Sequence, residues 1–178
     1  ETCQKILAAN HGQTKLLQTG PVLAGLVLGY PYLGNDNAVY LWAKPKDGAG
    51  LLSIFDKKRS RELLEVDPTT ATFWEVTTKK GLSGASFSNK GQPCQINFFA
   101  DETGGRLIFR WSEGIAVEVE TCLIAEEALL RGRIKATTKN GSSGLLAVTF
   151  PVVKGIQPLT PQSRQDAILH TQSFGRKT

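Results

Sequence analysis

The stretch from Gly105 to Phe150 constrains the fold more than any other part of the chain. Apolar residues recur at every second position along three successive segments, 106–111, 115–123 and 130–136. The apolar sides of these segments are formed by Leu107, Phe109 and Trp111, by Ile115, Val117, Val119 and Leu123, and by Leu130, Ile134 and Ala136. A period of two residues is typical of strands that cover a core with one face and meet water with the other. The block therefore predicts three consecutive strands of one sheet.

The charged sides of the second and third segments have opposite signs. Glu118 and Glu120 lie on one of them, and Arg131, Arg133 and Lys135 lie on the other. Opposite charges on neighbouring strands form cross-strand pairs worth about 0.2–1 kcal/mol each. We expect these pairs to favour the register more than they determine the stability.

The rest of the chain adds short segments of β-forming residues separated by turn residues. These segments are 14–19, 22–28, 38–43, 51–55, 73–78, 86–89, 95–100 and 145–150. Asn140-Gly141 is a strong hairpin signal, because both central positions of a type I′ turn require positive φ. About ten short strands without a long helix predict an all-β fold, an antiparallel β-sandwich.

Length and composition suit one globular domain. The chain has 178 residues, of which 40% are hydrophobic. Residues 1–37 are patterned least clearly, so we assign them to an N-terminal extension or edge strands and residues 38–178 to the sandwich. No apolar run reaches the roughly 18 residues that cross a bilayer, so no membrane-spanning segment is expected. Because Met is absent throughout, we expect the chain to be a piece of a longer polypeptide.

The sequence contains no recognisable catalytic or metal-binding motif. The three cysteines lack CxxC spacing, and there is no phosphate-binding loop, nucleophile elbow or metal-ligand cluster. We therefore assign no catalytic residue, no metal and no cofactor. The net charge of +5 permits an acidic partner, but the basic residues alternate with acidic ones instead of forming a tract. Nucleic acid is accordingly a disfavoured partner.

The order of several segments is similar to that of galactose-mutarotase-like β-supersandwich domains, which precede the catalytic barrel in some bacterial glycoside hydrolases and polysaccharide lyases. The segments that resemble the family's strands and turns are 50–58 with 61–64, then 73–76, 107–111, the pair 117–123 and 130–138, and 148–151. The resemblance covers about residues 38–175 and is one of pattern and order.

This resemblance implies a non-catalytic accessory domain of a carbohydrate-active enzyme. Such a domain packs on a catalytic module of the same polypeptide, contacts carbohydrate, and is secreted or periplasmic. A complete supersandwich is longer, so we expect further strands beyond Thr178. Mutarotases use two histidines and a carboxylate, and neither His11 nor His170 matches those positions. Two alternatives stay open: a stand-alone sugar-processing enzyme of the mutarotase-like class, and a basic module that binds an acidic partner.

Aromatic side chains are the candidate sugar contacts, because carbohydrate C–H faces pack on rings while nearby polar groups fix the orientation. Tyr30 and Tyr32 are expected in an exposed loop, since they are flanked by Gly29 and Gly34. Strand tryptophans can belong to the core or act as platforms. The full set of candidate carbohydrate contacts is Tyr30, Tyr32, Trp42, Trp111, His170 and Arg176.

Overall fold

The computed structural model of the protein describes residues 14–18, 20–64, 66–80, 83–138 and 144–157. Its strands are β1 (Thr14–Gln18), β2 (Leu23–Val27), β3 (Tyr30–Gly34), β4 (Ala38–Trp42), β5 (Leu51–Asp56), β6 (Arg61–Glu62), β7 (Glu75–Lys80), β8 (Ser83–Ser88), β9 (Gln95–Ala100), β10 (Gly104–Trp111), β11 (Ile115–Ile124), β12 (Leu130–Thr138) and β13 (Gly144–Thr149). One short 3-10 helix, η1 (Pro45–Asp47), follows β4. Within the described ranges the structure has no helix with the length and apolar character needed to cross a membrane.

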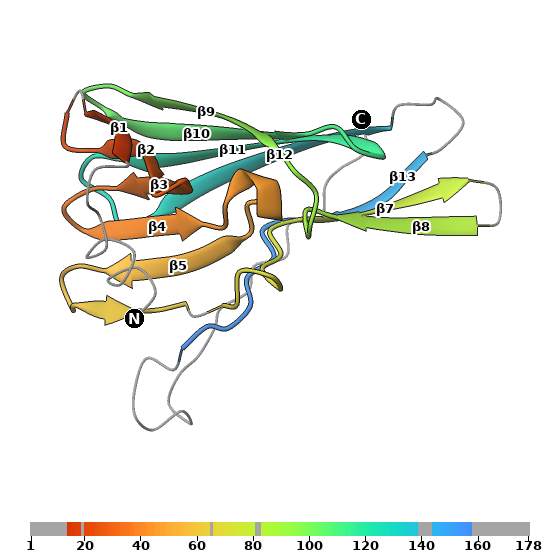
Figure 1. The fold of residues 1–178 in the computed structure, drawn as a ribbon, viewed down its shortest axis with the longest axis horizontal. Helices are drawn as coiled ribbons and strands as arrows, with labels where there is room; N and C mark the ends of the chain where they lie inside the picture. The colour runs from red at the N-terminus through yellow and green to blue at the C-terminus, as the bar shows by residue number, and fades with distance from the viewer. Residues whose placement is uncertain (1–13, 19, 65, 81–82, 139–143, 158–178) are drawn as a thin grey trace.

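The strands form three antiparallel sheets. Their orders are β1-β2-β3-β4-β5-β6, β12-β11-β10-β9 and β13-β7-β8. The first two sheets pack against each other, with β2 and β3 in contact with β10. Figure 1 shows this pair of layers at one end of the molecule and the three-stranded sheet extending beyond them. The predicted all-β antiparallel sandwich is confirmed.

The alternating block behaves as its pattern predicts. β10, β11 and β12 are consecutive neighbours in the four-stranded sheet, with Glu118 opposite Lys135 and Glu120 opposite Arg133. Along β11 every second residue is buried. The prediction of three consecutive strands in one sheet is therefore confirmed.

The expected loop around Tyr30 and Tyr32 is wrong, because both residues belong to β3, which pairs with β2 and β4. Leu28 and Gly29 both have positive φ, at 52° and 82°, and Val27 pairs with Tyr30 across them. This is the geometry of a two-residue β-hairpin turn. Gly29 therefore belongs to a tight turn between two strands and does not border a loop. The six-stranded sheet also runs without a break across residue 37, since β3 pairs directly with β4.

The chain between β12 and β13 changes sheets. β12 pairs with β11, whereas β13 pairs with β7 in the three-stranded sheet. The hairpin expected from Asn140-Gly141 is therefore wrong as regards the pairing of the flanking strands, while the turn itself lies outside the described residues. β13 finds its partner far away in the sequence, which no local turn signal can specify.

The core lies between the two larger sheets and is rich in aromatic rings. The ring centroids of Trp42 and Phe109 are 5.5 Å apart, and those of Trp74 and Trp111 are also 5.5 Å apart. Gly105 on β10 lets the sheets approach, because a Cβ there would lie 2.5 Å from Cγ1 of Val22 on the opposite layer. The inward faces of both sheets are thereby used by packing. The outward face of the four-stranded sheet carries exposed residues, whereas Val39 and Leu41 on the other side of β4 are buried in a second apolar cluster.

Candidate functional site

Three of the predicted sugar-contact residues are buried. The exposed fractions of Trp42, Trp111 and Tyr32 are 0%, 2% and 4%. Trp42 and Trp111 face the core aromatic cluster, and Tyr32 packs in a smaller cluster with Val27 and Leu41. A ring without an open face cannot stack on a sugar, so these three residues are corrected from candidate platforms to packing residues.

The remaining predicted contacts divide into two groups. Tyr30 is half-buried, and the Lys44 ammonium nitrogen lies 4.8 Å from the centre of its ring. One face of the Tyr30 ring is therefore engaged in a cation–π contact. His170 and Arg176, like His11, lie outside the described residues.

The structure points instead to the outward side of the four-stranded sheet, which we call the outer face. It presents the residues that alternate with the buried positions of β9, β10, β11 and β12. They are Gln95, Asn97, Phe99, Arg106, Ile108, Arg110, Ala116, Glu118, Glu120, Cys122, Arg131, Arg133, Lys135 and Thr137. Because successive side chains of a strand point to opposite faces, the packing of the core fixes this set. Cys122 lies on this outward side, as the alternation along its strand predicts.

The strand register arranges the outer face as rows that cross the four strands. One row runs Phe99, Arg106, Cys122, Arg131; the next runs Asn97, Ile108, Glu120, Arg133; and the third runs Gln95, Arg110, Glu118, Lys135. Neighbouring side chains in a row are close enough to interact directly. The outer face is thus a nearly regular grid of amide, guanidinium, carboxylate and ammonium groups.

Ion pairs connect the grid across its strands. Glu120 binds Arg106 at 3.1 Å through Oε1 and Arg133 at 2.8 Å through Oε2. Burial raises the pKa of Glu120, but the hydrogen bonds from Arg133 and Arg106 outweigh that effect and hold the pKa below its ordinary value. Arg110 donates from Nε to Glu118 Oε2 at 2.6 Å. The predicted cross-strand pairing is confirmed for Glu120 and Arg133.

Phe99 is the exposed aromatic residue of the outer face. Its exposed fraction is 45%, and the Arg106 guanidinium carbon lies 4.9 Å from its ring centre. Arg106 is therefore held between the ring on one side and Glu120 on the other, which limits its rotamers before any ligand binds.

Two hollows lie on the outer face, one beside the Arg106–Glu120 ion pair and one beside the Arg110–Glu118 ion pair. The first has a volume of about 400 Å³ and is lined by Phe99, Asp101, Thr103, Gly104, Gly105, Arg106, Glu120, Cys122 and Ile124. The second, of about 380 Å³, is lined by Gln95, Arg110, Trp111, Ser112, Ala116, Val117, Glu118, Lys135 and Thr137. Each hollow combines apolar and hydrogen-bonding groups, which is the combination that orients small polar ligands.

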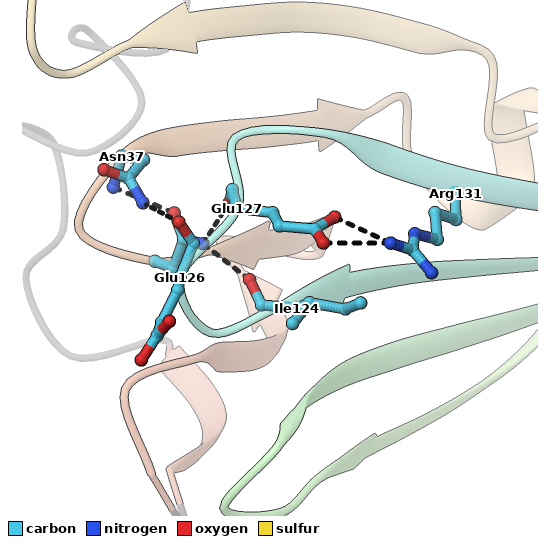
Figure 2. Close-up of polar contacts among 6 residues, drawn as sticks. Asn37, Ile124, Glu126, Glu127 and Arg131 are labelled. Carbon is cyan, nitrogen blue, oxygen red and sulfur yellow. Dashed lines mark hydrogen bonds and ion pairs between the residues drawn. The ribbon is translucent and has the colours of Figure 1, made fainter.

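A loop at the end of the outer face is fixed to the other sheet. Asn37 Nδ2 donates to the Glu126 carbonyl at 3.0 Å, and both carboxylate oxygens of Glu127 accept from Arg131 NH2 at 2.9 and 3.1 Å (Figure 2). Arg131 is the first basic residue of β12, so its contacts with Glu127 restrict the position of its guanidinium group.

Two carboxylates line the first hollow, those of Asp101 and Glu120. The Asp101 carboxylate accepts hydrogen bonds from Thr103 and Gly104, which hold its pKa below the ordinary value. Asp101 and Glu120, which line the same hollow, therefore both have lowered pKa values, whereas a glycosidase general acid needs a raised one. Burial raises the pKa of the Cys94 thiol to about 12, so that thiol is protonated at neutral pH.

No protein-family model matches the chain, and no curated protein matches it either.

No direct sequence signal marks Phe99, which lies in the segment Asn97-Phe98-Phe99. Phe98 and Phe99 are chemically equal there, and only the packing of β9 decides that Phe98 points inward and Phe99 outward. The pairing of Phe99 with Arg106 could have been found from the register of β9 on β10, in which the two residues are opposite each other.

Proposed function

We propose that the protein is a non-catalytic accessory β-sandwich domain of a carbohydrate-active enzyme, a glycoside hydrolase or polysaccharide lyase, and that its outer face contacts carbohydrate. The observation that carries the proposal is Phe99, which is half-exposed on the edge strand β9 and is bordered by the Arg106 guanidinium. An aromatic ring beside fixed hydrogen-bonding groups suits a sugar ring. The aromatic ring packs on the C–H face of the sugar, and the polar groups bind its hydroxyl groups.

The polar groups of the outer face suit sugar hydroxyl groups. Arg106 and Arg110 offer several N–H donors in a planar fork, and Glu118 and Glu120 offer acceptor oxygens. Because these groups already bind one another, their side chains have little rotational freedom before a ligand binds. They therefore lose little more when sugar hydroxyl groups replace some of these hydrogen bonds.

Exposed apolar side chains support the second part of the proposal, that the domain packs on a catalytic module. Several large apolar side chains between residues 129 and 156 are exposed: Leu129, Leu145, Leu146, Val148 and Ile156. An apolar groove of about 360 Å³ lies among Leu129, Phe150 and Val153. Exposed apolar surface of this kind is typical of contacts with another folded unit.

The experiment that tests the carbohydrate contact is a calorimetric titration of the chain with cello-, xylo-, manno- and galacto-oligosaccharides and with oligogalacturonate. We expect at least one of these to bind. The Phe99→Ala variant should then bind it roughly 2- to 10-fold more weakly, because a ring contact is worth about 0.5–1.5 kcal/mol. The matched control is Leu17→Ala, which shortens an apolar side chain of similar exposure, 43%, on the other sheet.

Two results would count against the proposal. The first is that none of the oligosaccharides binds. The second is that Phe99→Ala and Leu17→Ala bind equally well, since the ring would then contribute nothing to the contact.

A further inference from the structure

The outer face carries more positive than negative charge. Its cations are Arg106, Arg110, Arg131, Arg133 and Lys135, and its carboxylates are Glu118 and Glu120. Glu127 in the neighbouring loop adds one carboxylate, which is bound to Arg131. Asp101 at the rim is hydrogen-bonded to Thr103 and Gly104 of its own turn. The face therefore keeps an excess of cations even after its internal ion pairs are formed.

The excess is concentrated on β12, an edge strand of the sheet. Arg131, Arg133 and Lys135 occupy alternate positions of this strand, so they follow one another at intervals of roughly 7 Å along one face. Arg133 is 82% exposed at its side chain and gives only one of its nitrogens to Glu120. A row of this kind can meet the repeated anionic groups of an extended polymer.

Lys135 is the clearest unused charge of the row. Glu118 lies directly opposite it in the register, but Glu118 binds Arg110 at 2.6 Å. Among the described residues Lys135 takes part in no ion pair. It also lines the second hollow, beside Thr137 and Gln95, where a ligand group can reach it.

We propose that the outer face binds an anionic polysaccharide, one whose sugar units carry carboxylate or sulfate groups. The cations of β12 bind the anionic groups, and Phe99 with Arg106 holds a sugar ring at the other edge of the sheet. This inference rests on the proposed function and adds the chemical class of the glycan. Guanidinium groups bind carboxylate and sulfate by charge-assisted hydrogen bonds, which are about twice as strong as neutral ones.

The same features favour an anionic glycan over a nucleic acid. Single-stranded nucleic acids are bound through several stacked bases, whereas Phe99 is the one aromatic side chain that the described outer face presents. Nucleic acid is nonetheless included in the test as a competing outcome.

The test measures binding of the whole chain to four probes at several salt concentrations: polygalacturonate, its fully methyl-esterified form, a sulfated galactan and an oligothymidylate. We expect polygalacturonate or the sulfated galactan to bind at least about tenfold more tightly than the esterified polymer. The affinity should fall as salt rises, because anion neutralisation releases counterions. Comparison of the first and third probes distinguishes carboxylate from sulfate.

A pair of double variants assigns the binding to β12. Arg133→Ala with Lys135→Ala should weaken binding of the anionic glycan by roughly tenfold and reduce its salt dependence. Lys57→Ala with Lys58→Ala removes the same charge from an exposed turn of the six-stranded sheet and should leave binding unchanged. Melting temperatures of both variants check that neither result comes from unfolding.

The possible failures are distinguishable. Equal binding of the esterified and the acidic polymer, or equal loss in both double variants, overturns this inference and leaves the proposed function intact. Tighter binding of the oligothymidylate than of either acidic glycan also overturns it. Binding of no glycan at all, acidic or neutral, contradicts the proposed function itself.

Discussion

Asn35 connects the two large sheets through one buried amide. It lies at the end of β3 with an exposed fraction of 2%. Its Oδ1 accepts hydrogen bonds from the backbone N–H groups of Asn37 and Ala38 at 2.9 and 3.0 Å. Its Nδ2 donates to three backbone carbonyl groups at the end of β11 and in the loop that follows, those of Ile124 at 2.9 Å, Ala125 at 3.1 Å and Glu127 at 2.6 Å. This amide therefore fixes the loop that precedes the cation row of β12.

We expect Asn35→Ala to destabilise the fold by about 2–4 kcal/mol, because each buried backbone group left without a partner costs about 1–3 kcal/mol. The matched control is Asn37→Ala, which removes one exposed hydrogen bond to the Glu126 carbonyl and should cost no more than about 0.5 kcal/mol. Urea denaturation of the two variants measures the difference. Similar unfolding midpoints for both would show that Asn35 does not hold the sheets together.

At the residue scale, the sequence predicted the environment of some side chains and not of others. The direction of Glu118 and Arg133 followed from alternation in long, strongly patterned strands. Trp42 could not be assigned in the same way, because every residue of β4 is buried and alternation carries no information there. The role of Asn35 could not be predicted either, because it depends on carbonyl groups about 90 positions away in the chain.

At the element scale, β11 is the strand on which the ion pairs of the outer face converge. Glu120 on β11 binds Arg106 on β10 and Arg133 on β12, so a single carboxylate joins three strands. Its pKa is held below the ordinary value of about 4.3, so the folded state binds this proton less readily than the unfolded state. The stability that Glu120 contributes is therefore present above about pH 4.3 and is lost as the pH falls through the lowered pKa.

We expect the free energy of unfolding of Glu120→Gln to fall less steeply than that of the wild type as the pH is lowered from about 5 to about 3. The two curves should converge at the acid end, where the wild-type carboxylate is protonated. Glu118→Gln is the control, since Glu118 binds one strand neighbour and not two. Parallel curves for the wild type and Glu120→Gln over this range would show that ionisation of Glu120 does not contribute to the stability.

Strand identity was more predictable than strand pairing. Long alternating strands such as β11 and β12 specify both their own face and their neighbour, because a one-residue slip would turn their apolar side chains outward. β3 was missed because Pro31 and the flanking glycines are typical of loops, whereas here the hairpin turn at Gly29 and the partners on both sides impose a strand. β13 was predicted as a strand, but its pairing with β7 joins residues that are far apart in the sequence.

At the scale of the whole molecule, the packing of two sheets separates aromatic residues from polar ones. Trp42, Trp74 and Trp111 are all within the core, so the residue type most often associated with sugar stacking serves to join the layers here. The same packing turns Phe99 and the charged rows outward. The candidate site could not be predicted from aromatic content alone, because it depends on which side of each strand the core occupies.

The central claim is that the outer face of the four-stranded sheet is the surface that contacts carbohydrate. Its most direct test is a nuclear magnetic resonance titration of the isotopically labelled chain, with cello-oligosaccharide and oligogalacturonate added in separate experiments. We predict that at least one of them shifts the signals of Phe99, Arg106 and their neighbours on β9, β10 and β12, and leaves those of the six-stranded sheet unchanged. Shifts confined to the six-stranded sheet, or no shifts with either sugar, would contradict the claim.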